Sequence, residues 1–174
     1  MAKTYKKQPW LYSSGGDVVP ADRTVRIAAS QTYIASSPVY VSSAGTCKLE
    51  ATATGTDDSV SGFANVAAST ALAINTSIRI TSITADQLWY IYLSNGAADI
   101  VASAAFLGNA YGYNVQTTPA TEKGYMTLDV ANGNATMVVV DLAANLDPST
   151  YSTSDTQGLV IARFLPAVIN EIKA

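Results

Sequence analysis

The chain has 174 residues and a net charge of −3, with 48% hydrophobic and 13% charged residues, one cysteine and no histidine. This length suits one ordinary domain or two small ones, and the sequence is too apolar for a disordered chain. The missing histidine excludes histidine triads and the commonest zinc ligand, and a lone cysteine excludes an internal disulfide. Three lysines lie in the first seven residues, so the remainder carries −6 and lacks the clustered basic side chains that nucleic acids require.

Residues 1–20 predict an extended arm, because prolines and a Gly15-Gly16 pair interrupt them and the strand pattern begins only after Pro20. Aromatic side chains dominate interface energies and lysines match an acidic surface, so we expect the arm to bind a partner subunit. The alternative is that residues 1–8 are a solubilising tail and residues 9–12 cover the protein's own core. The candidate partner-binding residues are Lys3, Lys6, Lys7, Pro9, Trp10, Leu11 and Tyr12.

Residues 21–174 predict a single β-rich domain of short strands. A hairpin is expected around Gly45, between "SPVYVSS" and "TCKLEAT", and a turn at Asn95-Gly96 follows the aromatic run "LWYIYLS". Other strand-like runs are 23–30, 77–83 and 158–169. No fixed-period repeat is visible.

The stretch "YMTLDVANGNATMVVVD" predicts a second hairpin with Asn132-Gly133 at its tip, because Asn-Gly favours a two-residue turn. In that register apolar residues face each other on one side of the hairpin. The expected pairs are Leu128 with Met137, Met126 with Val139, and Asp129 with Thr136.

Helix signals are few. Residues 97–108 are rich in alanine and end at Gly108, residues 141–148 fit one turn stopped by Pro148, and residues 64–75 are ambiguous between helix and loop. The whole pattern predicts an all-β fold, a jelly-roll-like β-sandwich or β-barrel, with the extended N-terminal arm and at most one or two short helices.

No catalytic, cofactor or metal site is predicted. The aspartates lack calcium-loop spacing and are interpreted as turn formers, and no sequence feature pairs two carboxylates for glycoside hydrolysis. Cys47 is interpreted as a small buried side chain. No apolar run is long enough to span a membrane. An enzyme is therefore the least favoured class.

The tyrosines leave a binding alternative open. Tyr90 and Tyr92 are expected on one face of a strand, opposite Trp89, Ile91 and Leu93, and Tyr111 and Tyr113 would share a face in the same way. An exposed aromatic row stacks on sugars or fills an interface, whereas a buried row is core. We favour core or a subunit interface over a ligand site.

Four stretches resemble the decoration, or cement, proteins of tailed-bacteriophage heads: "SSPVYVSSAGTCKLEATATG", "SVSGFANVAAS", "SIRITSI" and "GYMTLDVANGNATMVVVD". The resemblance is one of texture over residues 15–141, a small-residue β-domain behind an extended arm, and it contains no invariant motif. It implies a non-enzymatic virion protein on the capsid surface, made in the host cytoplasm.

The resemblance also implies homo-oligomers that contact the major capsid protein of the same particle and stabilise the capsid. Neither nucleic acid nor membrane is an expected partner. The alternative function is a virion fibre or adhesin module that binds glycans through its tyrosines.

Overall fold

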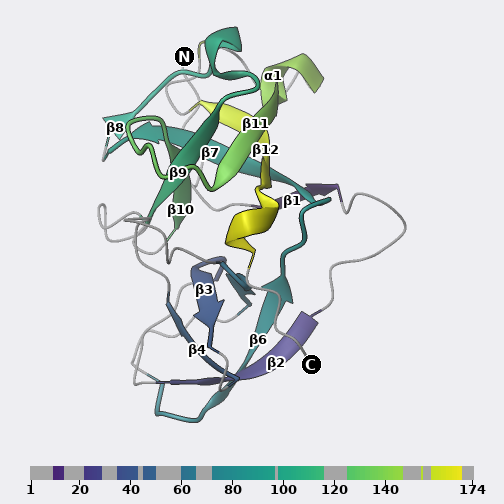
Figure 1. The fold of residues 1–174 in the computed structure, drawn as a ribbon, viewed down its shortest axis with the longest axis vertical. Helices are drawn as coiled ribbons and strands as arrows, with labels where there is room; N and C mark the ends of the chain where they lie inside the picture. Colours follow the sequence, from purple (N-terminus) through teal and green to yellow (C-terminus); the bar gives the residue numbers. More distant parts are fainter. Residues whose placement is uncertain are drawn as a thin grey trace.

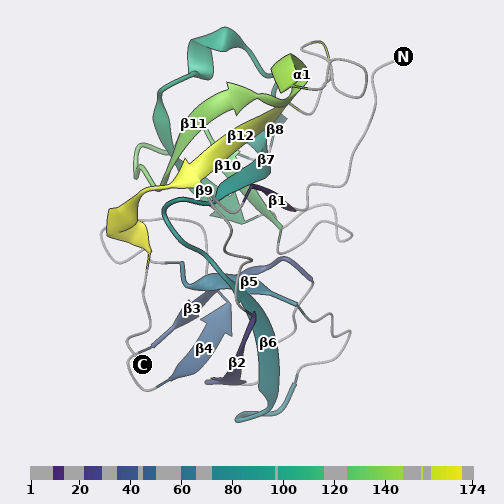
Figure 2. The ribbon, with the colours of Figure 1, turned by 90° about the vertical axis from the view of Figure 1, so that its right-hand side faces the viewer.

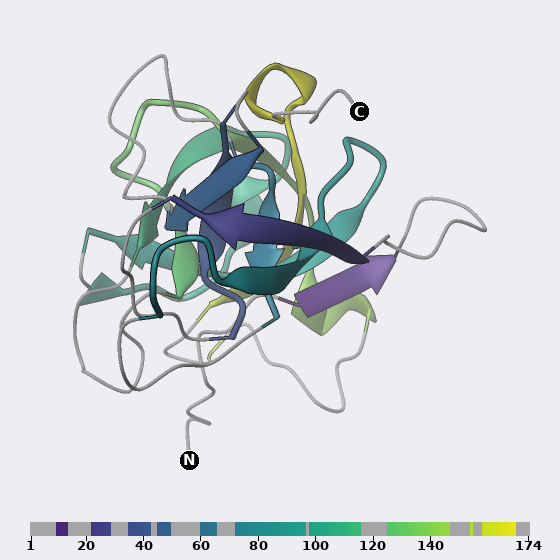
Figure 3. The same cartoon turned by 90° about the horizontal axis from the view of Figure 1, so that it is seen from below.

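The computed structural model describes residues 10–13, 22–28, 35–42, 45–49, 60–65, 72–96, 98–115, 125–146, 154 and 158–169. These residues form twelve short strands, one α-helical turn and two 3-10 turns, which confirms the predicted all-β fold. The strands gather into two units stacked along the long axis (Figures 1 and 2). Figure 3 looks along that axis, with the first unit nearest the viewer.

The first unit is a closed five-stranded barrel in the order β2-β4-β3-β5-β6. Its strands are β2 (Asp22–Ile27), β3 (Pro38–Val41), β4 (Thr46–Leu49), β5 (Gly62–Ala64) and β6 (Ser77–Ser82). Only the β2–β4 pair is parallel. Alternation along the strands fills the barrel with Val25, Ile27, Val39, Val41, Cys47, Ala64, Ile78 and Ile80. The buried position of Cys47 confirms its interpretation as a core residue.

The predicted hairpin around Gly45 is present as β3 and β4. Val41 lies opposite Cys47 and Val39 lies opposite Leu49 in an antiparallel ladder. Gly45 has a φ of 73° and donates its backbone N–H to the carbonyl oxygen of Ser42 at 2.9 Å. Glycine accepts this left-handed conformation without a steric penalty, so the local sequence sets this turn.

The second unit has seven strands, and five of them form a second closed barrel. They are β1 (Trp10–Ser13), β7 (Leu88–Asn95), β8 (Ala98–Asp99), β9 (Ala110–Val115), β10 (Met126–Asp129), β11 (Met137–Leu142) and β12 (Leu159–Phe164). The circuit runs β7-β10-β9-β11-β12 and back to β7, and only β7–β10 is parallel. β1 and β8 are additional strands on β7, and β8 follows the predicted turn at Asn95-Gly96.

The second predicted hairpin is wrong in its pairing, although both of its strands exist. β9 lies between β10 and β11, so Leu128 faces Tyr113 rather than Met137, and Met126 faces Val115. None of the three expected pairs occurs in the ladders of β10 and β11. On its other edge, β9 places Tyr111 opposite Met137.

Contacts of the Asn132-Gly133 segment explain why β10 does not pair with β11. The segment crosses β9: Gly112 donates its N–H to the Asn132 carbonyl at 2.9 Å, and the Asn132 side-chain amide donates to the carbonyl of Tyr113 at 3.1 Å. A side chain at position 112 would collide with the side chain of Asn132, so glycine there lets Asn132 keep this position. Packing across β9 therefore overrides the local preference of Asn-Gly for a two-residue turn.

One of the predicted helical segments is present and another is absent. One turn forms at α1 (Ala143–Leu146), where Asp141 accepts a hydrogen bond from the side chain of Asn145 at 2.8 Å. The helix expected over 97–108 is wrong, because β8 and a 3-10 turn (Ala104–Phe106) replace it, although Gly108 does adopt a positive φ of 75°. A second 3-10 turn spans Pro166–Val168. Most of the ambiguous stretch 64–75 lies outside the described residues.

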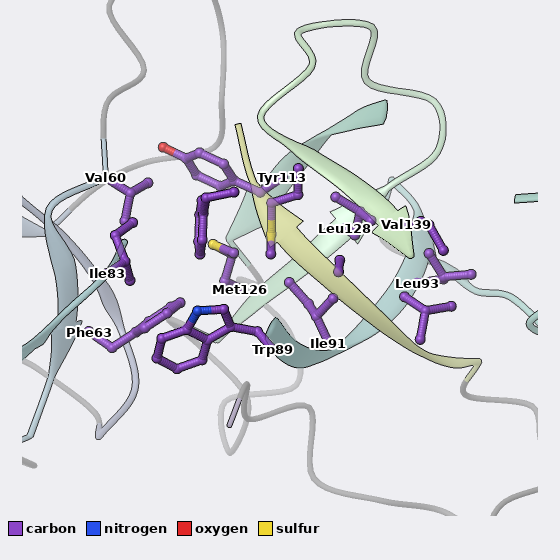
Figure 4. Packing of buried hydrophobic residues seen from close by; sticks show 14 of the residues in the cluster. Val60, Phe63, Ile83, Trp89, Ile91, Leu93, Tyr113, Met126, Leu128 and Val139 are labelled. Atoms are coloured by element: carbon purple, nitrogen blue, oxygen red, sulfur yellow. The ribbon is translucent and has the colours of Figure 1, made fainter. Parts of the chain in front are cut away.

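A hydrophobic cluster joins the two barrels. Phe63 of β5, Val60 just before β5 and Ile83 just after β6 pack against core residues of the second barrel, as Figure 4 shows. The rings of Phe63 and Trp89 are 4.7 Å apart between centroids. Each fully buried side chain of this size contributes roughly 1.5–3 kcal/mol, so the barrels stabilise each other. The chain beyond β12 adds to this contact, since Val60 donates its N–H to Val168 at 2.9 Å.

Candidate interface at the N-terminal strand

The predicted arm contains a strand that pairs with the second barrel. β1 runs antiparallel to β7, with Trp10 opposite Tyr90 and Leu11 opposite Trp89. The register shifts after Leu11, so Ser13 lies opposite Leu88. Lys3, Lys6, Lys7 and Pro9 lie outside the described residues, and so does the side chain of Trp10.

Leu11 and Tyr12 point to different environments. Leu11 is partly buried and packs against the cluster that joins the barrels. Tyr12 is 42% exposed, and its ring meets that of Tyr90 edge to face, at 5.2 Å between centroids and an angle of 85°. Leu11 therefore follows the alternative interpretation, in which this part of the arm covers the protein's own core. Tyr12 keeps a surface that another molecule can reach.

β1 is also an edge strand. In the described part of the chain it pairs with β7 alone, so its outer edge has no strand beside it. The backbone groups of such an edge can receive a further strand from another polypeptide. The exposed ring of Tyr12 adjoins this edge, which makes β1 the candidate interface of the second barrel.

The tyrosines of the predicted aromatic rows are mostly core. Tyr92 and Tyr113 are fully buried, at 1% and 0% exposure. Tyr90 and Tyr111 are partly buried, the former against the small cluster that contains Tyr92 and the latter against Phe106, at 6.2 Å between ring centroids. The prediction that Tyr90 and Tyr92 lie opposite Trp89, Ile91 and Leu93 is confirmed. The two rows do not form open platforms for stacking on a sugar.

A charged cluster on the first barrel was not predicted. The carboxylate of Asp22 accepts hydrogen bonds from Arg79 at 2.8 Å, Asn65 at 2.9 Å and Thr81 at 3.1 Å. The residues come from β2, β6 and the end of β5, which are far apart in sequence, so no local pattern signals the cluster. The Arg79–Asp22 pair is solvent-exposed and contributes at most about 1 kcal/mol.

Within the described ranges, no three cysteine, aspartate or glutamate side chains come together to hold a metal ion, and no helix is long and apolar enough to cross a membrane. Asp57, Asp58, Asp147 and Asp155 lie outside those ranges. Comparison of the chain with protein-family models, curated proteins and solved structures found no match.

Proposed function

We propose that the protein is a non-enzymatic structural component of a virus particle, a head decoration protein that bridges subunits of the major capsid protein. The observation that carries the proposal is the edge strand β1 with its exposed Tyr12. It gives the chain a short docking edge at the end of a basic, aromatic segment. Tyrosine is enriched at the energetic centres of protein interfaces.

The position of β1 also restricts where the arm lysines can act. Lys7 precedes Trp10 by three residues, so chain length keeps the Cα atom of Lys7 within about 11 Å of that of Trp10. Lysines in the segment that precedes this edge favour an acidic partner surface and speed its encounter. In this proposal a capsid subunit adds a strand to β1 and covers Tyr12, while the lysines face its acidic side chains.

Bridging makes modest contacts sufficient. Each copy touches more than one capsid subunit, and homo-oligomers multiply the contacts, so the linked sites bind far more tightly than one site alone. The low content of charged residues fits this role, because little charge is desolvated when the surface is covered. The protein then resides on the capsid surface after synthesis in the host cytoplasm.

Occupancy on purified particles tests the proposal. Particles that lack the protein are incubated with the full-length chain, with Tyr12→Ala, or with Leu146→Ala, and the bound protein is quantified. Tyr12→Ala is expected to weaken binding about 30-fold, the effect of losing an anchor of about 2 kcal/mol. Leu146, which is 45% exposed on the helical turn α1, is the matched control and is expected to bind normally.

Two results would contradict the proposal. One is that the protein does not associate with particles at a fixed stoichiometry. The other is that glycan addition raises its thermal stability while particle binding is absent, which would favour the fibre or adhesin alternative.

A further inference from the structure

The two barrels are equivalent residue by residue, although the sequence shows no repeat. In the parallel pair of the first barrel Ile27 lies opposite Cys47, and in the second Leu93 lies opposite Leu128. All four side chains point into their barrels. Ile27 is therefore the counterpart of Leu93, and Cys47 is the counterpart of Leu128.

The next two ladders follow from this starting point. Cys47 faces Val41, and Leu128 faces Tyr113, so β3 corresponds to β9. Two residues earlier on these strands, Val39 faces Gly62 and Tyr111 faces Met137, so β5 corresponds to β11.

The last ladders close the circuit. Ala64 faces Ile80, and its counterpart Val139 faces Ala162. Ile80 then faces Arg23, and Ala162 faces Trp89. Arg23 precedes Ile27 by four residues, and Trp89 precedes Leu93 by four, so the correspondence returns to its starting strand without a slip. The two barrels therefore share strand order, strand directions and register all the way round.

The two barrels differ in one respect, which is how the edge of their first strand, β2 or β7, is paired. On β7, β10 pairs with the C-terminal half of one edge, and β1 pairs with the N-terminal half, around Tyr90. On β2, β4 pairs with Arg26 and Ile27 of the corresponding edge. No strand in the described part of the chain pairs with residues 22–24 on that side, which is the counterpart of the place that β1 fills.

Backbone alternation shows that this edge offers hydrogen-bonding groups. Ile27 donates its N–H toward β6, to Thr76 at 3.0 Å, and Ala28 donates toward β4, to Cys47 at 2.7 Å. Every second residue counted back from Ala28 directs its backbone N–H and C=O to the β4 side of β2. Thr24 is one of these residues, and its groups lie beyond the start of β4. Its counterpart Tyr90 points to β1 in the same way, since Leu93 donates toward β12.

The side chains at this edge define the chemistry of the occupant. Arg26 is exposed and Arg23 is partly buried, and neither forms an ion pair within the described residues. The carboxylate of Asp22 is already engaged by Arg79. The unpaired charge at the edge is therefore positive. The chain's own N-terminal segment, with its three lysines, is a poor match for this edge.

We propose that residues 22–24 of β2 bind an extended, acidic segment of a partner protein, which adds as an antiparallel strand in the place that β1 occupies on β7. Its backbone pairs with Thr24, and the carboxylates on one face of the added strand lie beside Arg26. The proposal does not depend on a role in virus particles, because it concerns a different edge from β1 and its test uses the isolated protein.

The first measurement is amide hydrogen exchange of the full-length chain, read by NMR. The N–H of Thr24 is expected to exchange fast, whereas the N–H of its counterpart Tyr90 is expected to be protected by β1. The second measurement adds a short peptide that alternates glutamate with valine, or a matched peptide with lysine in place of glutamate. The acidic peptide is expected to shift the amide signals of Asp22 and Thr24 and to slow exchange at Thr24.

Two variants sharpen the test. Thr24→Pro removes the N–H that faces the open edge and is expected to abolish peptide binding, while Thr24→Val keeps the N–H and retains binding. Arg26→Glu is expected to weaken the acidic peptide roughly two- to tenfold and to reverse the preference toward the basic peptide, and it keeps the test decisive if the proline variant fails to fold.

Three results would overturn the proposal. The first is slow exchange at Thr24 without peptide, which would mean that the chain covers its own edge. The second is equal binding of both peptides, or no binding of either. The third is a peptide response at Tyr90 and Leu11 instead of β2, which would mean that the peptide displaces β1.

Discussion

Replacing Leu11 with alanine tests whether β1 is held on the second barrel in solution. Leu11 is the side chain of β1 that packs against the cluster joining the barrels, and it is partly buried. Full burial of a leucine contributes roughly 1.5–3 kcal/mol, so a partly buried one contributes about 1 kcal/mol. Weaker pairing of β1 with β7 adds a smaller loss, because the ladder is short. We expect Leu11→Ala to lower the free energy of unfolding by about 1–1.5 kcal/mol.

Urea unfolding followed by circular dichroism measures this change, and thermal unfolding should show a decrease in Tm of about 2–6 °C for a chain of this size. Two leucines serve as references. Leu128 is fully buried, so Leu128→Ala should cost about 2–5 kcal/mol, whereas Leu146 is 45% exposed and Leu146→Ala should change stability by less than about 0.5 kcal/mol.

The loss of unfolding free energy for Leu11→Ala, compared with the losses for these two references, decides whether β1 packs on the second barrel. A value equal to that of Leu146→Ala would refute the packing of β1 on β7 and restore the interpretation of residues 1–20 as an arm without contact with its own domain. A value as large as that of Leu128→Ala would mean that β1 is an integral part of the core. In that case removal of residues 1–14 should unfold the second barrel, which circular dichroism of the truncated chain would show.

Three further substitutions have expected outcomes. Gly112→Ala should lower the free energy of unfolding by about 1–3 kcal/mol, because the added methyl group meets the side chain of Asn132. In urea unfolding, the double variant with Asn132→Gly should recover part of this loss. Equal losses for the single and double variants would contradict the crossing of β9. Cys47→Ser should cost about 1–3 kcal/mol through a hydroxyl in the first barrel's core, and reductant should leave the stability of the native chain unchanged. Asp22→Asn should change the free energy of unfolding by less than about 1 kcal/mol, because the pair with Arg79 is exposed. A larger effect in a thermal melt would show that the charged cluster around Asp22 holds β2 against β6.

The candidate interface was predictable only in part. Residue type alone pointed to Trp10, Leu11 and Tyr12 as contact residues, because large apolar side chains in a segment without its own core must cover something. Residue type does not indicate whether they cover the same chain or a neighbour. Pairing with β7 is a contact between residues about 80 positions apart, and short-range patterns carry no information about the choice of such a partner.

The sequence by itself determined several of the strands and their inward faces. Alternation sends Val25 and Ile27 into the first barrel, and Gly45 fixes the turn between β3 and β4, because both effects act between near neighbours in the chain. The pairing of strands is different in kind. β10 and β11 have in-register apolar residues and an Asn-Gly turn between them, and yet each pairs with β9, because burial of both strands around a closed barrel outweighs one tight turn.

The equivalence of the two barrels was likewise decided by tertiary structure. Ile27 corresponds to Leu93, but Cys47 corresponds to Leu128, so the spacing between equivalent residues changes from strand to strand. Loops of different length shift the spacing at little energetic cost, and the inward positions require only apolar side chains of suitable size. No repeat period therefore survives in the sequence, whereas the hydrogen-bond register, which fixes how a five-stranded barrel closes, is the same in both barrels.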